Sequence, residues 1–134
     1  MTSHVEQVYK QLADEHESIM RLVDRIKQHG TVLHLVPLLD ELHTVLIKHF
    51  AHEQFPGGLY ESLGAYGPEY HDDLRVLVNE HCWILSSVRG VLERARLAHE
   101  DNAEDILRDV ASIVQRLHEH EHKEHELAEK VLRQ

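Results

Sequence analysis

The sequence predicts an all-α protein, an up-down-up-down four-helix bundle that occupies residues 1–134 as a single domain. Three observations support this fold class. Apolar residues recur at alternating spacings of three and four along four segments, which is the pattern of the buried face of an amphipathic helix. Capping residues and turn-forming residues separate these segments. Alternation of apolar and polar residues with β-branched enrichment is absent, so we expect no strand.

The first helix is expected over residues 5–28. Ser3, with Glu6 three residues later, has the spacing of a capping box at the start of this helix. Gly30 follows the helix as a C-terminal stop.

The second helix is expected to end at the run Pro56-Gly57-Gly58. Its start has two interpretations, because Pro37 either lies in the first turn or kinks a helix that begins after Thr31. Residues 56–67 then form the longest connection, since they contain four of the six glycines.

The third helix is expected to open at Pro68 and to continue to about residue 99. Gly90 lies inside it and indicates a point of close helix packing. Asp101, with Glu104 three residues later, forms a second capping box. The fourth helix therefore starts there and continues to the C-terminus.

The charge balance and the single cysteine limit the partners and the compartment. Lysine and arginine number 14 against 24 acidic residues, a net charge of −10 that repels phosphate backbones, so we expect no nucleic-acid partner. No apolar run has membrane-spanning length and no signal peptide is present, so we expect no membrane association. Cys82 cannot form an internal disulfide and is expected to pack between helices. These features predict a cytoplasmic protein that is a monomer or a weak homo-oligomer.

The apolar faces of the four helices form a core stripe of 28 positions, and six of them are occupied by histidine or glutamate. The stripe consists of residues 5, 9, 12, 16, 19, 23 and 26 in the first helix, 35, 39, 42, 46, 49 and 53 in the second, 74, 77, 81, 84, 88, 91 and 95 in the third, and 106, 110, 113, 117, 120, 124, 127 and 131 in the fourth. Burial of unpaired carboxylates and imidazoles is costly, so such a set needs a shared solution. A satisfied buried polar network is one interpretation, but such networks normally include Asn, Gln, Ser or Tyr. Convergence of imidazoles and carboxylates inside a bundle favours a metal site. Its candidate ligands are His16, His49, Glu53, His81, His120 and Glu124.

The same pattern occurs twice in the chain. Glu15-His16 is repeated as Glu80-His81, 65 residues later. The run Leu46-x-x-His49-x-x-x-Glu53 is repeated as Leu117-x-x-His120-x-x-x-Glu124, 71 residues later. Two helix hairpins related by a pseudo-two-fold axis would each supply two histidines and one glutamate, which suits two metal ions better than one. Mixed imidazole and carboxylate ligands fit iron, manganese or zinc. The glutamates that precede the helix 1 and helix 3 histidines are candidate hydrogen-bond acceptors for ligands on neighbouring helices.

Other histidines and tyrosines have two interpretations each. His118, His122 and His125 could form a nickel or zinc tract, but they lie off the core stripe and are expected on a solvated face. His52 flanks the stripe as a possible seventh ligand or a surface residue. Tyrosines 60, 66 and 70 are expected to cover the end of the bundle, or one of them reaches the metal.

These motifs together resemble the hemerythrin-like, HHE cation-binding domain family. The resemblance rests on Glu-His in the first and third helices, His49-Phe50-Ala51-His52-Glu53 in the second, and His-x-x-x-Glu in the fourth, and it covers essentially the whole chain. It implies a non-haem centre of two iron ions bridged by an oxygen species. In this chain the four stripe histidines would be terminal ligands, and the carboxylates Glu53 and Glu124 would bridge the ions.

The resemblance implies that the protein binds or senses a small diatomic ligand, dioxygen or nitric oxide, at iron. Oxygen carriers of the family have a second histidine one turn after the position of His81, where this chain has Leu85. Simple oxygen carriage is therefore not the expectation. Two other functions remain open: a di-iron enzyme that decomposes peroxide or reduces nitric oxide, and a regulatory module that responds to iron or oxygen.

Overall fold

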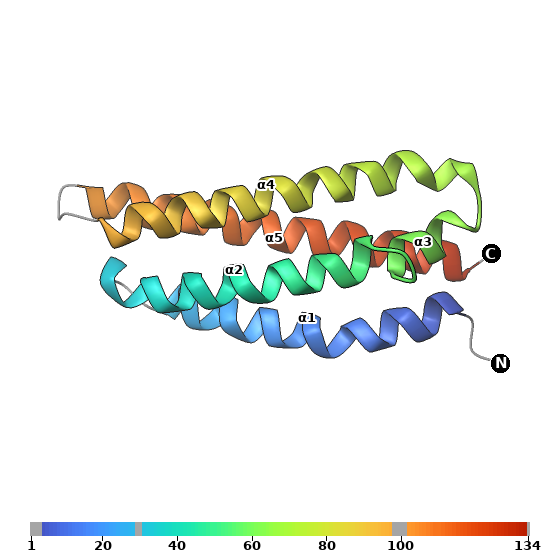
Figure 1. The fold of residues 1–134 in the computed structure, drawn as a ribbon, viewed down its shortest axis with the longest axis horizontal. Helices are drawn as coiled ribbons and strands as arrows, with labels where there is room; N and C mark the ends of the chain where they lie inside the picture. Colours follow the sequence, from blue (N-terminus) through green and yellow to red (C-terminus); the bar gives the residue numbers. More distant parts are fainter. Residues whose placement is uncertain (1–3, 29–30, 98–101, 134) are drawn as a thin grey trace.

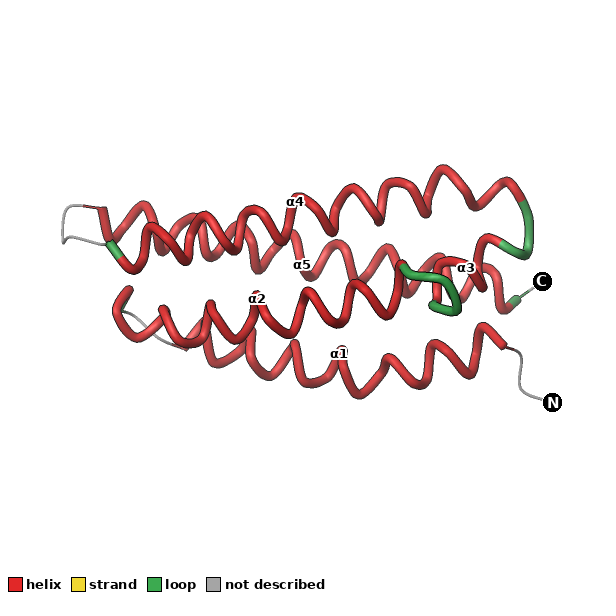
Figure 2. The backbone as a smooth tube through the Cα atoms, viewed as in Figure 1, coloured by secondary structure: helices red, strands yellow, loops and turns green. Residues whose placement is uncertain are grey.

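The computed structural model describes residues 4–28, 31–97 and 102–133. Four long helices lie along the long axis of the molecule (Figure 1): α1 (His4–Gln28), α2 (Val32–Gln54), α4 (His71–Arg96) and α5 (Ala103–Leu132). The described residues contain no strand, and loops are confined to the ends of the long helices (Figure 2). The prediction of an all-helical protein is confirmed.

The four long helices pack as a bundle. Each contacts two neighbours, in the ring order α1, α2, α4, α5. The start of α1 and the end of α5 lie at the same end of the molecule (Figure 1). None of the helices in the described ranges is long and apolar enough to cross a membrane.

The structure decides the start of the second helix and adjusts the third. α2 begins at Val32, directly after Thr31, so Pro37 lies inside the helix and not in its first turn. The third helix begins with a 3-10 turn, η1 (Pro68–Tyr70), and α4 follows it directly from His71. α4 ends at Arg96, a few residues earlier than predicted. Residues 3, 30 and 101, on which the predicted capping boxes and glycine stop depend, lie outside the described ranges.

A short helix that the sequence did not predict, α3 (Leu59–Gly64), folds the connection between α2 and α4 against the bundle. Two glycines make the turn into it possible. Gly57 has a φ of 88°, in the left-handed region that favours glycine. A Cβ at Gly58 would lie 2.3 Å from the carbonyl oxygen of His52. α3 is thereby held against the site end of α2, with Tyr60 buried beneath it.

The predicted core stripe is buried at all but two of its positions, Tyr9 and His16, which are partly exposed. The apolar core consists of two separate clusters. The larger one contains residues 19–50 of α1 and α2 and residues 84–117 of α4 and α5. The smaller one is formed by the other ends of α1, α4 and α5 together with α3. The histidines and glutamates of the stripe form a polar layer between the two clusters.

Two expectations about packing are wrong. Gly90 is exposed, and a Cβ built on it meets nothing within 4 Å, so this glycine does not mark close packing. Cys82 is also exposed and does not pack between helices. Both residues lie outside the apolar stripe of α4. Only positions on that stripe are predicted by the spacing to be buried.

Candidate metal centre

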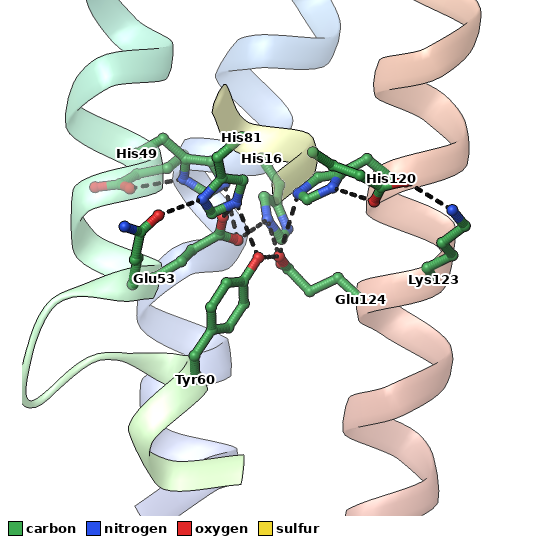
Figure 3. Close-up of polar contacts among 11 residues, drawn as sticks. His16, His49, Glu53, Tyr60, His81, His120, Lys123 and Glu124 are labelled. Atoms are coloured by element: carbon green, nitrogen blue, oxygen red, sulfur yellow. Dashed lines mark hydrogen bonds and ion pairs between the residues drawn. The ribbon is translucent and has the colours of Figure 1, made fainter. Parts of the chain in front are cut away.

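All six candidate ligands meet in one layer of the bundle (Figure 3). α1 supplies His16, α4 supplies His81, and α2 and α5 each supply a histidine and the glutamate one turn later. Only the His16 side chain is partly exposed, at 19%, whereas the other five are 1–2% exposed. The sequence repeat thus brings two hairpins together at a common buried layer.

The two carboxylates each contact imidazoles from both hairpins. Glu53 Oε2 lies 3.3 Å from His16 Nε2 and 3.2 Å from His49 Nε2, while its Oε1 lies 3.2 Å from His81 Nε2. Glu124 Oε1 lies 3.3 Å from His16 Nε2, and its Oε2 lies 3.8 Å from His120 Nε2. A carboxylate that reaches donors of both halves has the placement that a bridge between two metal ions requires.

Three of the imidazoles are oriented by acceptors on neighbouring helices. His49 donates through Nδ1 to Glu15 at 2.9 Å, and His120 donates through Nδ1 to Glu80 at 2.9 Å. His81 donates through Nδ1 to the side-chain oxygen of Gln54 at 3.0 Å. Because Nδ1 donates outward in all three rings, Nε2 is the nitrogen that faces the centre, and it can bind a metal ion once it carries no proton. The roles expected for the two glutamates are therefore seen, whereas Gln54 was not singled out by the sequence.

The two orienting carboxylates are themselves held from the surface side. His52 donates through Nδ1 to Glu15 at 2.7 Å. Lys123 donates to Glu80 at 2.6 Å (Figure 3). His52 is exposed and points away from the layer of candidate ligands, so the structure places it as a surface residue. The hydrogen bonds from His49 and His52 lower the pKa of Glu15, and those from Lys123 and His120 lower the pKa of Glu80, although burial acts in the opposite direction.

Several buried polar atoms at the centre have no well-aligned hydrogen bond, although each lies 3.2–3.8 Å from an oppositely charged group. Among the described residues these include Glu53 Oε1, His120 Nε2 and Glu124 Oε1. Each such atom costs about 1–3 kcal/mol when left unsatisfied. A satisfied polar network would have paired them, because nearby donors and acceptors were available to the same helices. Unpaired oxygen and nitrogen atoms that converge from two helices fit a cation between them.

Two groups of side chains could each hold an ion. Glu53, His81, His120 and Glu124 form a buried group whose ligand atoms lie within 4.8 Å of one another. The second group consists of His16, His49 and Glu121, with the same separation. The six predicted residues are thus divided between two neighbouring positions. Glu121 joins them as a residue that the stripe did not include.

Protons balance the charges of the centre when no metal is bound. Burial alone would lower the pKa of His16, but hydrogen bonds with Glu124 and Glu53 outweigh it and raise the pKa to about 10. Burial and the neighbouring charge of Glu53 hold the pKa of Glu124 well above its usual range. Burial would also raise the pKa of Glu53, but its hydrogen bonds to Glu124 and three histidines hold it well below its usual range. A metal ion would displace the protons on His16 and Glu124.

α3 places a tyrosine hydroxyl at the centre. Tyr60 donates to Glu124 Oε2 at 2.8 Å, and its oxygen lies 2.9 Å from His81 Nε2 (Figure 3). Burial and the charges of Glu124 and Glu53 raise the pKa of Tyr60, so the phenol is neutral. Of the three tyrosines near this end, Tyr66 is exposed and the buried Tyr70 hydroxyl has no hydrogen-bond partner. Tyr60 is therefore the tyrosine that reaches the layer of candidate ligands, and whether it contacts a metal stays a prediction.

The other histidines of α5 lie outside the centre. His122 is exposed and paired with Glu126, and His125 is exposed and bonded to Tyr9. His118 is partly buried, and its Nε2 lies 3.3 Å from Lys27 Nζ. The expectation of a solvated face is confirmed for His122 and His125, and His118 packs at its border with α1.

Comparison of the chain with protein-family models, curated proteins and solved structures found no match.

Proposed function

We propose that this chain is a hemerythrin-like, non-haem di-iron protein with an up-down-up-down bundle, and that it binds or senses dioxygen or nitric oxide at its centre. The observation that carries the proposal is the set of buried, unpartnered ligand atoms on Glu53, His120 and Glu124. They lie in a layer that also holds three further imidazoles and contains no lysine or arginine. Imidazole and carboxylate ligands in this ratio suit iron among the transition metals.

The donor set divides naturally between two ions. His16 and His49 belong to one hairpin, His81 and His120 belong to the other, and a carboxylate of each hairpin reaches both sets. When bound, two iron ions supply electrons and coordination positions for a small ligand. Four imidazoles and two bridging carboxylates leave such positions free on both ions.

The chain's own residues prepare the site for this chemistry. Glu15, Glu80 and Gln54 fix the imidazole rings with Nε2 toward the centre. The two apolar clusters above and below the polar layer exclude water from it. The hydroxyl of Tyr60 supplies a hydrogen-bond donor at the edge of the centre, where a small ligand would bind.

Tyr60 also favours a second candidate function, a di-iron enzyme that decomposes peroxide or reduces nitric oxide. Both reactions require the transfer of a proton to an oxygen atom: peroxide decomposition moves a proton between its oxygens without net consumption, and nitric oxide reduction consumes two protons and two electrons to form water. A phenol within hydrogen-bond distance of Glu124 can hold such a proton beside the site. Binding alone needs no proton donor. Sustained turnover of peroxide or nitric oxide without loss of iron would favour this second function.

The decisive experiment is metal analysis together with optical spectra of the aerobic, reduced and nitric-oxide-treated protein. We expect close to two iron ions per chain, oxo-to-iron charge-transfer bands in the aerobic protein, and loss of these bands on reduction. Nitric oxide should give a new absorption spectrum with the reduced protein. One zinc ion per chain, with no uptake of iron on reconstitution, would refute the proposal.

A further inference from the structure

Glu121 is a partly buried carboxylate that the predicted ligand set does not use. It follows His120 on α5 and lies on the flank of the core stripe that faces α1. Its Oε1 atom is buried and has no hydrogen-bond partner. Its carboxylate forms a group with the ring nitrogens of His16 and His49, with all three ligand atoms within 4.8 Å of one another.

The internal repeat shows what stands at the matching position in the other half. The 71-residue offset that relates Glu53 to Glu124 relates Phe50 to Glu121, and the 65-residue offset relates His16 to His81. Phe50 stacks flat on the His81 ring, with the ring centroids 3.8 Å apart and an interplanar angle of 9°. The same position therefore presents an aromatic ring to one imidazole and a carboxylate to the other.

This difference changes the donors that each half offers. Around His81 the flanking position is closed by Phe50, and the polar neighbours are Gln54 and Tyr60. Around His16 the flanking position holds a carboxylate whose buried Oε1 has no hydrogen-bond partner. The pseudo-two-fold relation of the two hairpins is broken at this position in a way that adds one ligand to one half only.

We propose that Glu121 is a metal ligand, and that together with His16 and His49 it holds one of two inequivalent ions. This inference rests on the proposed function. The second ion, beside His81 and His120, has no counterpart of Glu121. Two divalent ions would carry four positive charges against the two charges of the bridging carboxylates, so a third carboxylate, partly buried beside them, would reduce the remaining excess. The ion beside Glu121 would consequently have more protein ligands and more carboxylate oxygens. The ion beside Tyr60 would have more coordination positions free for a small ligand.

The test compares Glu121→Gln, which keeps the size of the side chain and removes the anionic oxygen, with Glu119→Gln. Glu119 is exposed on the same helix and accepts a hydrogen bond from Gln115, so it is a matched control. Each protein is loaded with ⁵⁷Fe and studied by Mössbauer spectroscopy, and the binding of each ion is measured by titration with Co²⁺.

We expect two quadrupole doublets of equal area in the wild type and in Glu119→Gln. In Glu121→Gln one doublet should change while the other keeps its parameters, and the affinity for one Co²⁺ ion should fall about tenfold or more. Two unchanged doublets and two unchanged affinities in Glu121→Gln would overturn the inference. A wild-type protein that takes up no iron would instead refute the proposed function, which is a separate result.

A second variant keeps the inference testable if Glu121→Gln does not fold, as judged by far-UV circular dichroism. Glu121→His replaces the carboxylate oxygen with a ring nitrogen that can also bind a metal. It should retain both ions and alter the parameters of a single doublet. Two doublets identical to those of the wild type would again overturn the inference.

Discussion

The protonated state of His16 predicts that the metal-free protein loses stability as the pH rises. Hydrogen bonds with Glu124 and Glu53 outweigh burial and raise the pKa of His16 from 6.5 to about 10 in the folded protein. Between these two values the folded state binds a proton that the unfolded state does not. The stabilisation is therefore complete below pH 6.5 and is lost as the pH rises toward 10.

The size of the effect follows from the linkage relation. A difference of one bound proton changes the free energy of unfolding by about 1.4 kcal/mol per pH unit. Between about pH 7.5 and about pH 9.5 the contribution of His16 is therefore about 3 kcal/mol, a large share of the 5–15 kcal/mol of an ordinary domain. Burial raises the pKa of Glu121 to about 7, so this carboxylate is already ionised in that window.

Urea denaturation in the presence of a chelator measures this loss. The wild type is compared with His16→Gln, which cannot bind the proton. Glu124 is present in both proteins, but His16 lowers its pKa, so the difference between them reports the proton shared by His16 and its carboxylates. The wild type should lose stability more steeply by about 1.4 kcal/mol per pH unit. Parallel curves for the two proteins would refute the assignment of a shared proton to His16 and its carboxylates.

Four further results are expected. Glu124→Ala should lose most of the bound iron in metal analysis while Glu126→Ala, exposed on the same helix, should retain it; equal losses would contradict the assignment of the bridge. Gly90→Ala should raise the free energy of unfolding by about 0.5–1 kcal/mol in urea denaturation, because Gly90 lies inside α4 with free space around it. Tyr60→Phe should lower the stability of the metal-free protein by about 1–3 kcal/mol, because Glu124 Oε2 loses its donor; an unchanged midpoint would show that water replaces the hydroxyl. Iron removal should lower the melting temperature and speed amide hydrogen exchange over residues 117–127 before the other helices, and unchanged protection there would indicate a preformed polar network.

The core and the six candidate ligands could be predicted because they share one register. A bundle helix buries positions at spacings of three and four, so a histidine at such a position, as at His81, is assigned to the interior by its neighbours alone. His16 departs from full burial because it lies beside Tyr9, the other partly exposed position of the stripe on α1. The register of a helix predicts which side chains face the interior of the bundle. It does not predict how deeply each of them is buried.

The residues that the sequence did not reveal act across elements. Gln54 and Glu121 lie on helix flanks, and their relation to the site depends on which helix is the neighbour on that side. α3 has only six residues, between two glycine-containing turns, which is too short to show a helical period. The spacing of residues therefore could not show that Tyr60, rather than one of the other two tyrosines, reaches the site. Such contacts depend on the packing angle and order of the helices, which a single sequence does not encode locally.

The polar layer between the two apolar clusters has a consequence for how the molecule opens. Each end of the bundle has its own apolar core; α1, α4 and α5 cross the layer, whereas α2 ends at it, one residue after Glu53. Repulsion or open space in the layer would therefore let the end that carries α3 fray as a separate cooperative unit, while the larger cluster stays folded. An ion bound by residues of all four helices would act as a cross-link at the middle of the rod. Its loss would convert one folding unit into two, and a proteolytic cut would then be expected first at the α3 end.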